Sequence, residues 1–159
     1  MTPLRLNIQG EQRLFEAINR LIDLVSDQRE RGWQGNVDVR LDFERRYLDS
    51  EGAGRWTPLD DEYRLHKVER VGQVPILQYT GRLYRSLTEQ GAPGYVREET
   101  ADSLRVGSSN PLARYHQEGA GRLPKREVIV ITDEEGHEHL RVIEESYSNI
   151  AQSLGFKVI

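Results

Sequence analysis

The chain has 159 residues, a formal net charge of −4 and no cysteine. It can therefore form neither a disulfide nor a thiolate zinc site, and its charge excludes a protein that coats nucleic acid through bulk positive charge. Only 36 % of the residues are hydrophobic, whereas 30 % are charged. We therefore expect a single domain over residues 1–159 with a modest core, in which some apolar side chains pack against partner subunits.

The N-terminal region predicts one helix and one ambiguous element. Residues 11–28 carry an apolar face at helical spacing, formed by Leu14, Ile18, Leu21, Ile22 and Val25. Residues 37–48 alternate apolar and charged side chains as a strand does, but they also fit helical spacing with Asn36 as the N-cap. The length of this element and its long charged side chains favour a helix.

The middle of the chain predicts short elements separated by glycine and proline. Residues 49–59 read as a loop whose Trp56 plugs a small core. Asp60 is placed to cap a short helix through Tyr63 and Lys67, and residues 68–77 then read as a loop. Thr80 is expected to cap a helix over residues 81–90.

A hairpin and a strand follow. Residues 95–99 and 104–107 read as the hairpin, and residues 111–118 as one or two helical turns. The run Val128–Ile131 inside residues 127–132 predicts the strongest strand of the chain, buried on both faces.

The C-terminal region predicts a helix from about residue 135 to 153 that ends at Gly155, and then a short edge strand or docked tail over 156–159. The fold class is therefore α+β, with N-terminal and C-terminal amphipathic helices packed on a small antiparallel sheet.

No catalytic or cofactor motif is found. Adjacent acids such as Glu98-Glu99 lack an apolar pocket that would raise a carboxyl pKa, and the nucleophile-elbow, P-loop and dinucleotide motifs are missing. His137 and His139 are two residues apart at the head of a helix, where their side chains point apart. We expect no catalytic residue, metal or cofactor.

Charge is divided along the chain. Residues 64–126 hold eleven Lys or Arg against six acids, with tyrosines between them, and residues 133–145 hold six acids against one Arg. The basic middle suits either nucleic acid or a protein interface. Opposite charges in one chain suit head-to-tail packing of identical subunits, and intramolecular ion pairs explain them equally well.

An ordered series of short motifs is more specific than any single element. It runs from Trp56-Thr57-Pro58-Leu59 through Thr80-Gly81-Arg82-Leu83 with Ser86, Val106-Gly107-Ser108 and Ala113-Arg114-Tyr115-His116-Gln117-Glu118-Gly119 to Pro124-Lys125-Arg126. The series resembles the phage virion morphogenesis family of tail-completion proteins over roughly residues 55–126. After the P-x-R motif the sequence departs from the usual family pattern, because Glu127 and the Val128–Ile131 run follow directly.

The matching residues are candidates for partner contacts or for the shared family structure: Trp56, Pro58, Leu59, Thr80, Gly81, Leu83, Ser86, Gly107, Tyr115, His116, Gln117, Gly119, Pro124 and Arg126. Thr80 would cap a helix, Gly107 and Gly119 would permit turns, and Trp56 and His116 would be core or interface residues rather than catalysts.

The resemblance implies a non-enzymatic assembly protein that completes the head-proximal end of a tail for head–tail joining. It would act as a ring of identical subunits, a hexamer by analogy with six-fold tails. Its partners would be the tail tube or terminator or the head–neck proteins, with no membrane and no nucleic acid. We expect it in the host cytoplasm during assembly and in the virion afterwards. The alternative is a DNA-contacting packaging or regulatory factor that uses the basic middle.

Overall fold

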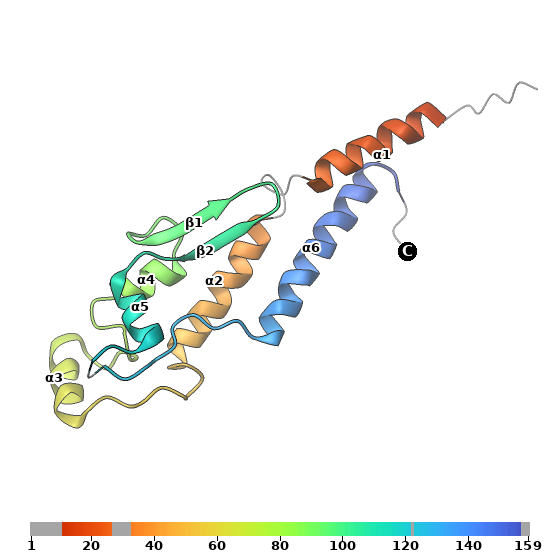
Figure 1. The fold of residues 1–159 in the computed structure, drawn as a ribbon. Coiled ribbons are helices and arrows are strands. Elements are labelled where there is room, and N and C mark those ends of the chain that lie inside the picture. Colours follow the sequence, from red (N-terminus) through yellow and green to blue (C-terminus); the bar gives the residue numbers. More distant parts are fainter. Residues whose placement is uncertain (1–10, 27–32, 122, 157–159) are drawn as a thin grey trace, which may run out of the picture.

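The computed structural model describes residues 11–26, 33–121 and 123–156. Helices dominate and a single hairpin provides the sheet, which confirms the α+β class. In chain order the elements are α1 Glu11–Ser26, α2 Trp33–Asp49, α3 Asp61–Val71, α4 Arg82–Thr88, β1 Tyr95–Glu99, β2 Leu104–Ser108, α5 Pro111–Glu118 and α6 Asp133–Ser153. The molecule is elongated, with α3 and α5 at one end and α1 at the other (Figure 1).

Helix α2 runs through the middle of the molecule and confirms the helical reading of residues 37–48. It begins at Trp33, so the predicted N-cap Asn36 is instead a buried residue inside the helix. Val37, Leu41 and Leu48 are buried at spacings of four and seven residues, which is the pattern of one helix face. Through its two sides α2 contacts α4 and α6.

The hairpin was predicted correctly. β1 pairs antiparallel with β2 in a register that runs from Tyr95 opposite Ser108 to Glu99 opposite Leu104. The connecting turn is closed by the Thr100 amide, which donates to the Ser103 carbonyl at 2.8 Å. Helix α4 packs against both strands and α2 against β2.

The helix starts at α3 and α4 differ in how well the sequence predicted them. The Asp60 side chain accepts hydrogen bonds from the amides of Glu62 and Tyr63, as expected of an N-cap. The helix then continues to Val71, so the predicted loop from residue 68 began too early. At α4 the N-cap is Gly81 in the left-handed conformation, not Thr80, whose hydroxyl reaches only the Arg82 amide at 3.4 Å. Helix α4 ends at Thr88 rather than 90.

The predicted strand at residues 127–132 is wrong. The segment crosses the molecule without a β-partner, although Val128 is fully buried. Burial also ends within the run, since Ile131 is 75 % exposed. An apolar run indicates that side chains are covered; it does not say that a neighbouring strand is available to pair with the backbone.

Helix α6 was predicted well. The Thr132 hydroxyl caps it by accepting from the Glu135 amide, and Gly155 follows its C-terminal end with φ 85°. It crosses α2 closely, because a Cβ built on Gly35 would lie 2.6 Å from Val142 Cγ1. Residues 157–159 of the predicted tail and residues 27–28 of the predicted first helix lie outside the described residues.

Helix α1 packs along the C-terminal half of α6, away from the rest of the molecule (Figure 1). The main apolar core lies at the other end and consists of Leu48, Trp56, Ile76, Leu83, Leu87, Ala113 and Val128. Within the described ranges, no helix combines the length and the hydropathy that a membrane crossing requires.

Candidate functional site

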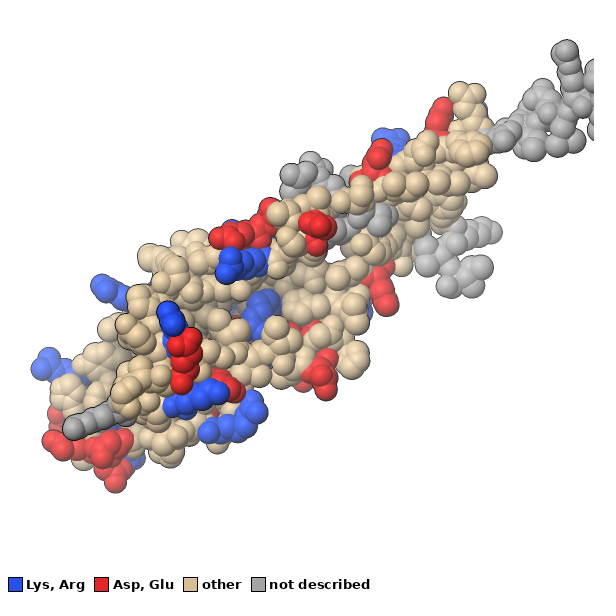
Figure 2. All heavy atoms as spheres, viewed as in Figure 1, with Lys and Arg blue, Asp and Glu red and all other residues tan. Residues whose placement is uncertain are grey.

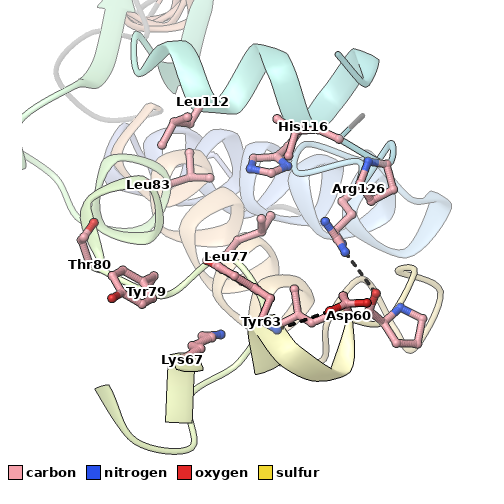
Figure 3. A pocket seen from close by; sticks show the side chains of 14 residues that line it. Asp60, Tyr63, Lys67, Leu77, Tyr79, Thr80, Leu83, Leu112, His116 and Arg126 are labelled. Carbon is pink, nitrogen blue, oxygen red and sulfur yellow. Dashed lines mark hydrogen bonds between the residues drawn. The ribbon is translucent and has the colours of Figure 1, made fainter. Parts of the chain in front are cut away.

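Half of the family-motif residues converge on one apolar cleft. It has a volume of about 680 Å³ and lies between α3, α5, the start of α4 and the loops that precede and follow them (Figure 3). Seven of the predicted candidates line it: Pro58, Leu59, Thr80, Leu83, His116, Pro124 and Arg126. The sequence reasoning did not assign the other lining residues to the site: Asp60, Tyr63, Lys67, Leu77, Tyr79, Leu112 and Leu123.

Arg126 fixes one wall of the cleft. Its side chain is only 5 % exposed. Its Nε and Nη2 donate to the Thr57 carbonyl at 3.0 and 2.8 Å, and Nη2 also reaches the Pro58 carbonyl. Burial lowers the pKa of Arg126 from its usual value, while Glu51 opposes this shift. The guanidinium therefore ties the loop after Trp56 to the loop after α5 and is not free to bind an anion.

Lys67 fixes the opposite wall of the cleft. Its ammonium donates to the carbonyls of Val74 and Pro75 at 2.9 and 2.6 Å. The residue is 3 % exposed, and burial lowers the pKa of Lys67 although Glu51 partly restores it. Glu51 also accepts a hydrogen bond from the Ile76 amide at 2.8 Å. Both cations of the cleft thus hold loops in place.

His116 lies in the wall of the cleft. Burial, and next the nearby Arg126, lower the pKa of His116, so the imidazole is neutral at neutral pH. Among the described residues its Nδ1 has no hydrogen-bond partner. A general base needs an orienting group and a substrate-facing proton acceptor. His116, 9 % exposed and without a carboxylate bonded to it in the described part of the chain, is a wall residue.

Exposed apolar side chains surround the cleft. Tyr63, Leu112 and Leu123 line it and are each between 45 % and 47 % exposed. Tyr115, on α5 but outside the lining, is 48 % exposed. Clustered apolar exposure next to a cleft is typical of a surface that a protein partner covers.

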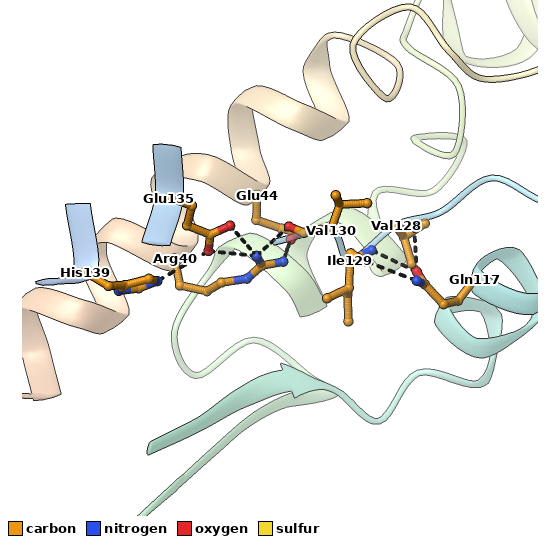
Figure 4. A network of polar contacts seen from close by, with 8 residues as sticks. All are labelled: Arg40, Glu44, Gln117, Val128, Ile129, Val130, Glu135 and His139. Carbon is orange, nitrogen blue, oxygen red and sulfur yellow. Dashed lines mark hydrogen bonds and ion pairs between the residues drawn. The ribbon is translucent and has the colours of Figure 1, made fainter. Parts of the chain in front are cut away.

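Gln117, a motif residue, replaces the missing β-ladder. Its Oε1 accepts from the amides of Val128 and Ile129, both at 2.9 Å, and its Nε2 donates to the Ile129 carbonyl at 3.0 Å (Figure 4). The indole of Trp56 donates to the Glu127 carbonyl at 3.0 Å in the same segment. These two side chains satisfy backbone groups that a strand partner would otherwise satisfy.

Three further motif residues shape the backbone or join α4 to the hairpin. Ser86 is fully buried, and its hydroxyl lies 2.8 Å from the hydroxyl of Ser108 in β2. Gly119 ends α5 with φ 78°, as predicted for a turn. The turn predicted at Gly107 is wrong, because this residue lies inside β2 opposite Val96.

A second polar cluster, which the sequence did not predict, joins α2 to α6. Arg40 pairs with Glu44 and donates to Glu135 at 2.8 Å and to the Val130 carbonyl at 3.0 Å (Figure 4). Glu44 is 2 % exposed, and burial raises its pKa to about 8 although Arg40 opposes this. Val130 and Glu135 are 90 and 95 residues from Arg40 in the sequence, so no local pattern could find these two partners.

His139 extends this cluster, and its ring lies 2.8 Å from Asn36 and 3.4 Å from Glu135. His137 is two positions away along α6. No group of three metal-ligating side chains forms within the residues that the structure describes.

Part of the divided charge of the sequence is paired within the chain. The basic middle forms ion pairs such as Arg97–Glu99, Arg105–Glu98, Arg114–Glu118 and Lys125–Glu127. The acids of α6 pair with Arg40, Arg46 and Arg141. On the face shown in Figure 2, blue and red side chains are interspersed. This geometry favours the intramolecular explanation over a field that would attract DNA or a second subunit.

The sequence was compared with known families and proteins. The model of the phage virion morphogenesis family matches residues 38–147. This range includes most of α2, the hairpin, all of the cleft and most of α6. No curated protein and no solved structure is significantly similar to the chain. The match covers more than two thirds of the sequence and all of the ordered motifs, so the chain belongs to the phage virion morphogenesis family.

Proposed function

We propose that this protein is a non-enzymatic assembly protein that completes the head-proximal end of a phage tail, so that the tail can join a head. The family match supports a role in virion morphogenesis. The observation that carries the proposal further is the convergence of separate motifs on one apolar cleft whose cations are occupied in holding its walls.

Such a cleft suits the docking of a protein segment. Arg126 and Lys67 donate to backbone carbonyls, and burial keeps His116 neutral, so an apolar ligand meets no free charge from these three groups. In this proposal copies of the protein form a ring around the tail axis, with six copies if they follow the symmetry of tails. The ring contacts the tail tube or terminator and the head–neck proteins, first in the host cytoplasm and then in the virion.

The experiment is deletion of the gene from its phage and electron microscopy of the particles. We expect filled heads beside unjoined tails, and wild-type protein supplied in trans should restore complete virions. Complete virions from the deletion would overturn the proposal. Unfilled heads would instead favour the alternative role in DNA packaging.

A matched pair of variants then tests the cleft. Leu112 and Leu65 are both exposed leucines on short helices, but only Leu112 lines the cleft. Leu112→Asp should fail to restore virions, whereas Leu65→Asp should restore them. Equal restoration by the two variants would show that the cleft is not the working surface.

A further inference from the structure

Helix α1 leaves one edge of its apolar face uncovered. Ala17, Leu21 and Leu24 are half-buried, and α6 is the helix that α1 contacts. Four large side chains on the adjoining edge remain exposed: Leu14 by 54 %, Phe15 by 58 %, Ile18 by 37 % and Ile22 by 58 %. An amphipathic helix normally buries such a stripe, so this edge is a surface without a partner among the residues that the structure describes.

The cleft is the matching unpartnered surface, and it lies at the opposite end of the molecule. Figure 1 places α3 and α5 at one end and α1 at the other, with α2 and the hairpin between them. A helix at one end of an elongated molecule cannot fill a cleft at the other end. If the two surfaces meet, they meet between two copies of the chain.

We propose that the edge of α1 formed by Leu14, Phe15, Ile18 and Ile22 docks in the cleft between α3 and α5 of a second copy. This is a helix-in-groove contact in which one copy completes the site of the next. It uses two different surfaces of the same chain and is therefore heterologous. Repeated contacts of this kind close into a ring or continue as a filament.

The dimensions fit. The four side chains span nine residues of helix from Leu14 to Ile22, and the eight steps between them cover about 12 Å along the axis. The cleft volume of about 680 Å³ lies in the range of sites that enclose a small ligand. It can take the side chains of one helix edge while the backbone of that helix stays outside.

Charge does not oppose the contact. The lining cations Lys67 and Arg126 donate to backbone carbonyls of their own copy, so they leave an apolar surface to the incoming helix. By their spacing, Glu16 and Asp23 lie on the side of the helix away from the docking edge, so these carboxylates stay in water.

Exposed apolar surface is what one copy of the chain can offer to a second copy. Several charged side chains of the basic middle and of α6 already form ion pairs within one copy. The exposed edge of α1 and the rim residues Leu112 and Leu123 have no comparable use inside the copy. Contacts between subunits typically gain their free energy from such apolar centres with a polar surround.

Disulfide cross-linking tests the contact in the full-length protein, because the chain contains no cysteine of its own. Ile18→Cys and Leu112→Cys are prepared as two single variants, one of them with an affinity tag that changes its mass. After mixing and mild oxidation, the mixed-mass dimer should dominate. Ile18→Cys with Leu65→Cys is the matched control and should give at least tenfold less dimer.

Two results would overturn the proposal. Dimers that form as readily from Ile18→Cys alone would show a symmetric contact between α1 helices. Absence of the mixed dimer above the Leu65→Cys control would show that α1 does not reach the cleft. The double variant Ile18→Cys/Leu112→Cys adds a measurement: a ladder that stops at one size indicates a closed ring and counts its copies.

Light scattering supplies an independent readout. Ile22→Glu should shift the protein to a smaller mass, whereas Asn19→Asp, an exposed polar change on the same helix, should not. Circular dichroism should show the same helix content in both variants, because neither residue belongs to the core. An unchanged mass for Ile22→Glu would contradict the proposal.

The inference rests on the proposed assembly role for its purpose, but the two fail separately. If cross-links form as expected and the deletion phage still joins heads to tails, the contact is real and the proposed function is wrong. If the deletion phage is blocked and no mixed dimer forms, the function stands and the cleft receives a different partner.

Discussion

The two ends of the molecule treat apolar residues in opposite ways. At the cleft end, Trp56 and Val128 are buried, and polar side chains such as Gln117 and Arg126 fix the surrounding backbone. At the α1 end, side chains as large as that of Phe15 are exposed to water, and the main contact of the helix is with α6. The comparison teaches that hydrophobic pattern alone does not separate a buried core from an exposed apolar face. At the cleft end, burial is accompanied by hydrogen bonds from side chains to the surrounding backbone.

The largest difference between the two ends should appear in truncations of aromatic residues. Trp56→Ala removes a buried ring and its bond to the Glu127 carbonyl, and should lower the free energy of unfolding by about 3–5 kcal/mol. Phe15→Ala at the α1 end should change it by less than about 0.5 kcal/mol. Urea unfolding at low protein concentration measures both. Similar losses would mean that α1 is part of the core.

The next largest effect is a pH dependence of stability that arises from Glu44, in the Arg40 cluster between α2 and α6. Glu44 ionises near pH 4.5 when unfolded but at about 8 in the fold, so the folded chain holds an extra proton between these values. Stability should therefore fall, on the order of 3 kcal/mol, as the pH rises from about 5 to 8. Glu44→Gln should flatten this dependence, whereas Glu134→Gln, a surface control, should keep it. Parallel curves for all three proteins would refute the raised pKa.

A smaller loss of stability is expected when Gln117, which holds the segment of residues 127–132, is truncated. Gln117→Ala leaves the amides of Val128 and Ile129 without their acceptor and should cost about 2 kcal/mol. Hydrogen exchange should accelerate at these two amides before it does elsewhere. Gln12→Ala, on exposed helix surface at the α1 end, is the control and should change neither quantity. Unaltered protection at 128 and 129 would show that other groups hold the segment.

The smallest expected effect concerns DNA. Because several arginines of the basic middle are ion-paired with neighbouring acids and Lys67 and Arg126 donate to backbone carbonyls, a gel-shift titration with duplex DNA should show no binding even at low salt. Salt-sensitive binding that Arg105→Ala and Arg114→Ala weaken would instead revive the packaging alternative. Ala substitutions at Arg13 and Arg20 on α1 provide the charge-matched control.

The sequence predicted what is encoded locally. The Asp60 cap, the hairpin and α6 depend on neighbouring residues and were found, whereas the seven predicted cleft residues were singled out only by the resemblance. The Thr80 cap failed because an adjacent glycine can take the left-handed conformation that starts the helix one residue later. The Arg40 cluster and the convergence of Leu112 with Tyr63 depend on folding of distant segments, which periodicity does not report.

Gln117 has a consequence for how this family can vary. Its amide binds backbone groups only, so it makes few demands on the sequence that it holds. Residues 128 and 129 must not be proline, since both donate an N–H, and position 128 must be apolar enough to bury. A strand pair would have imposed a register, in which one inserted residue turns every side chain over. The side chains of Gln117, Trp56 and Arg40 hold individual backbone groups instead, so they place few demands on a side chain of this stretch that points into water, such as that of Ile131.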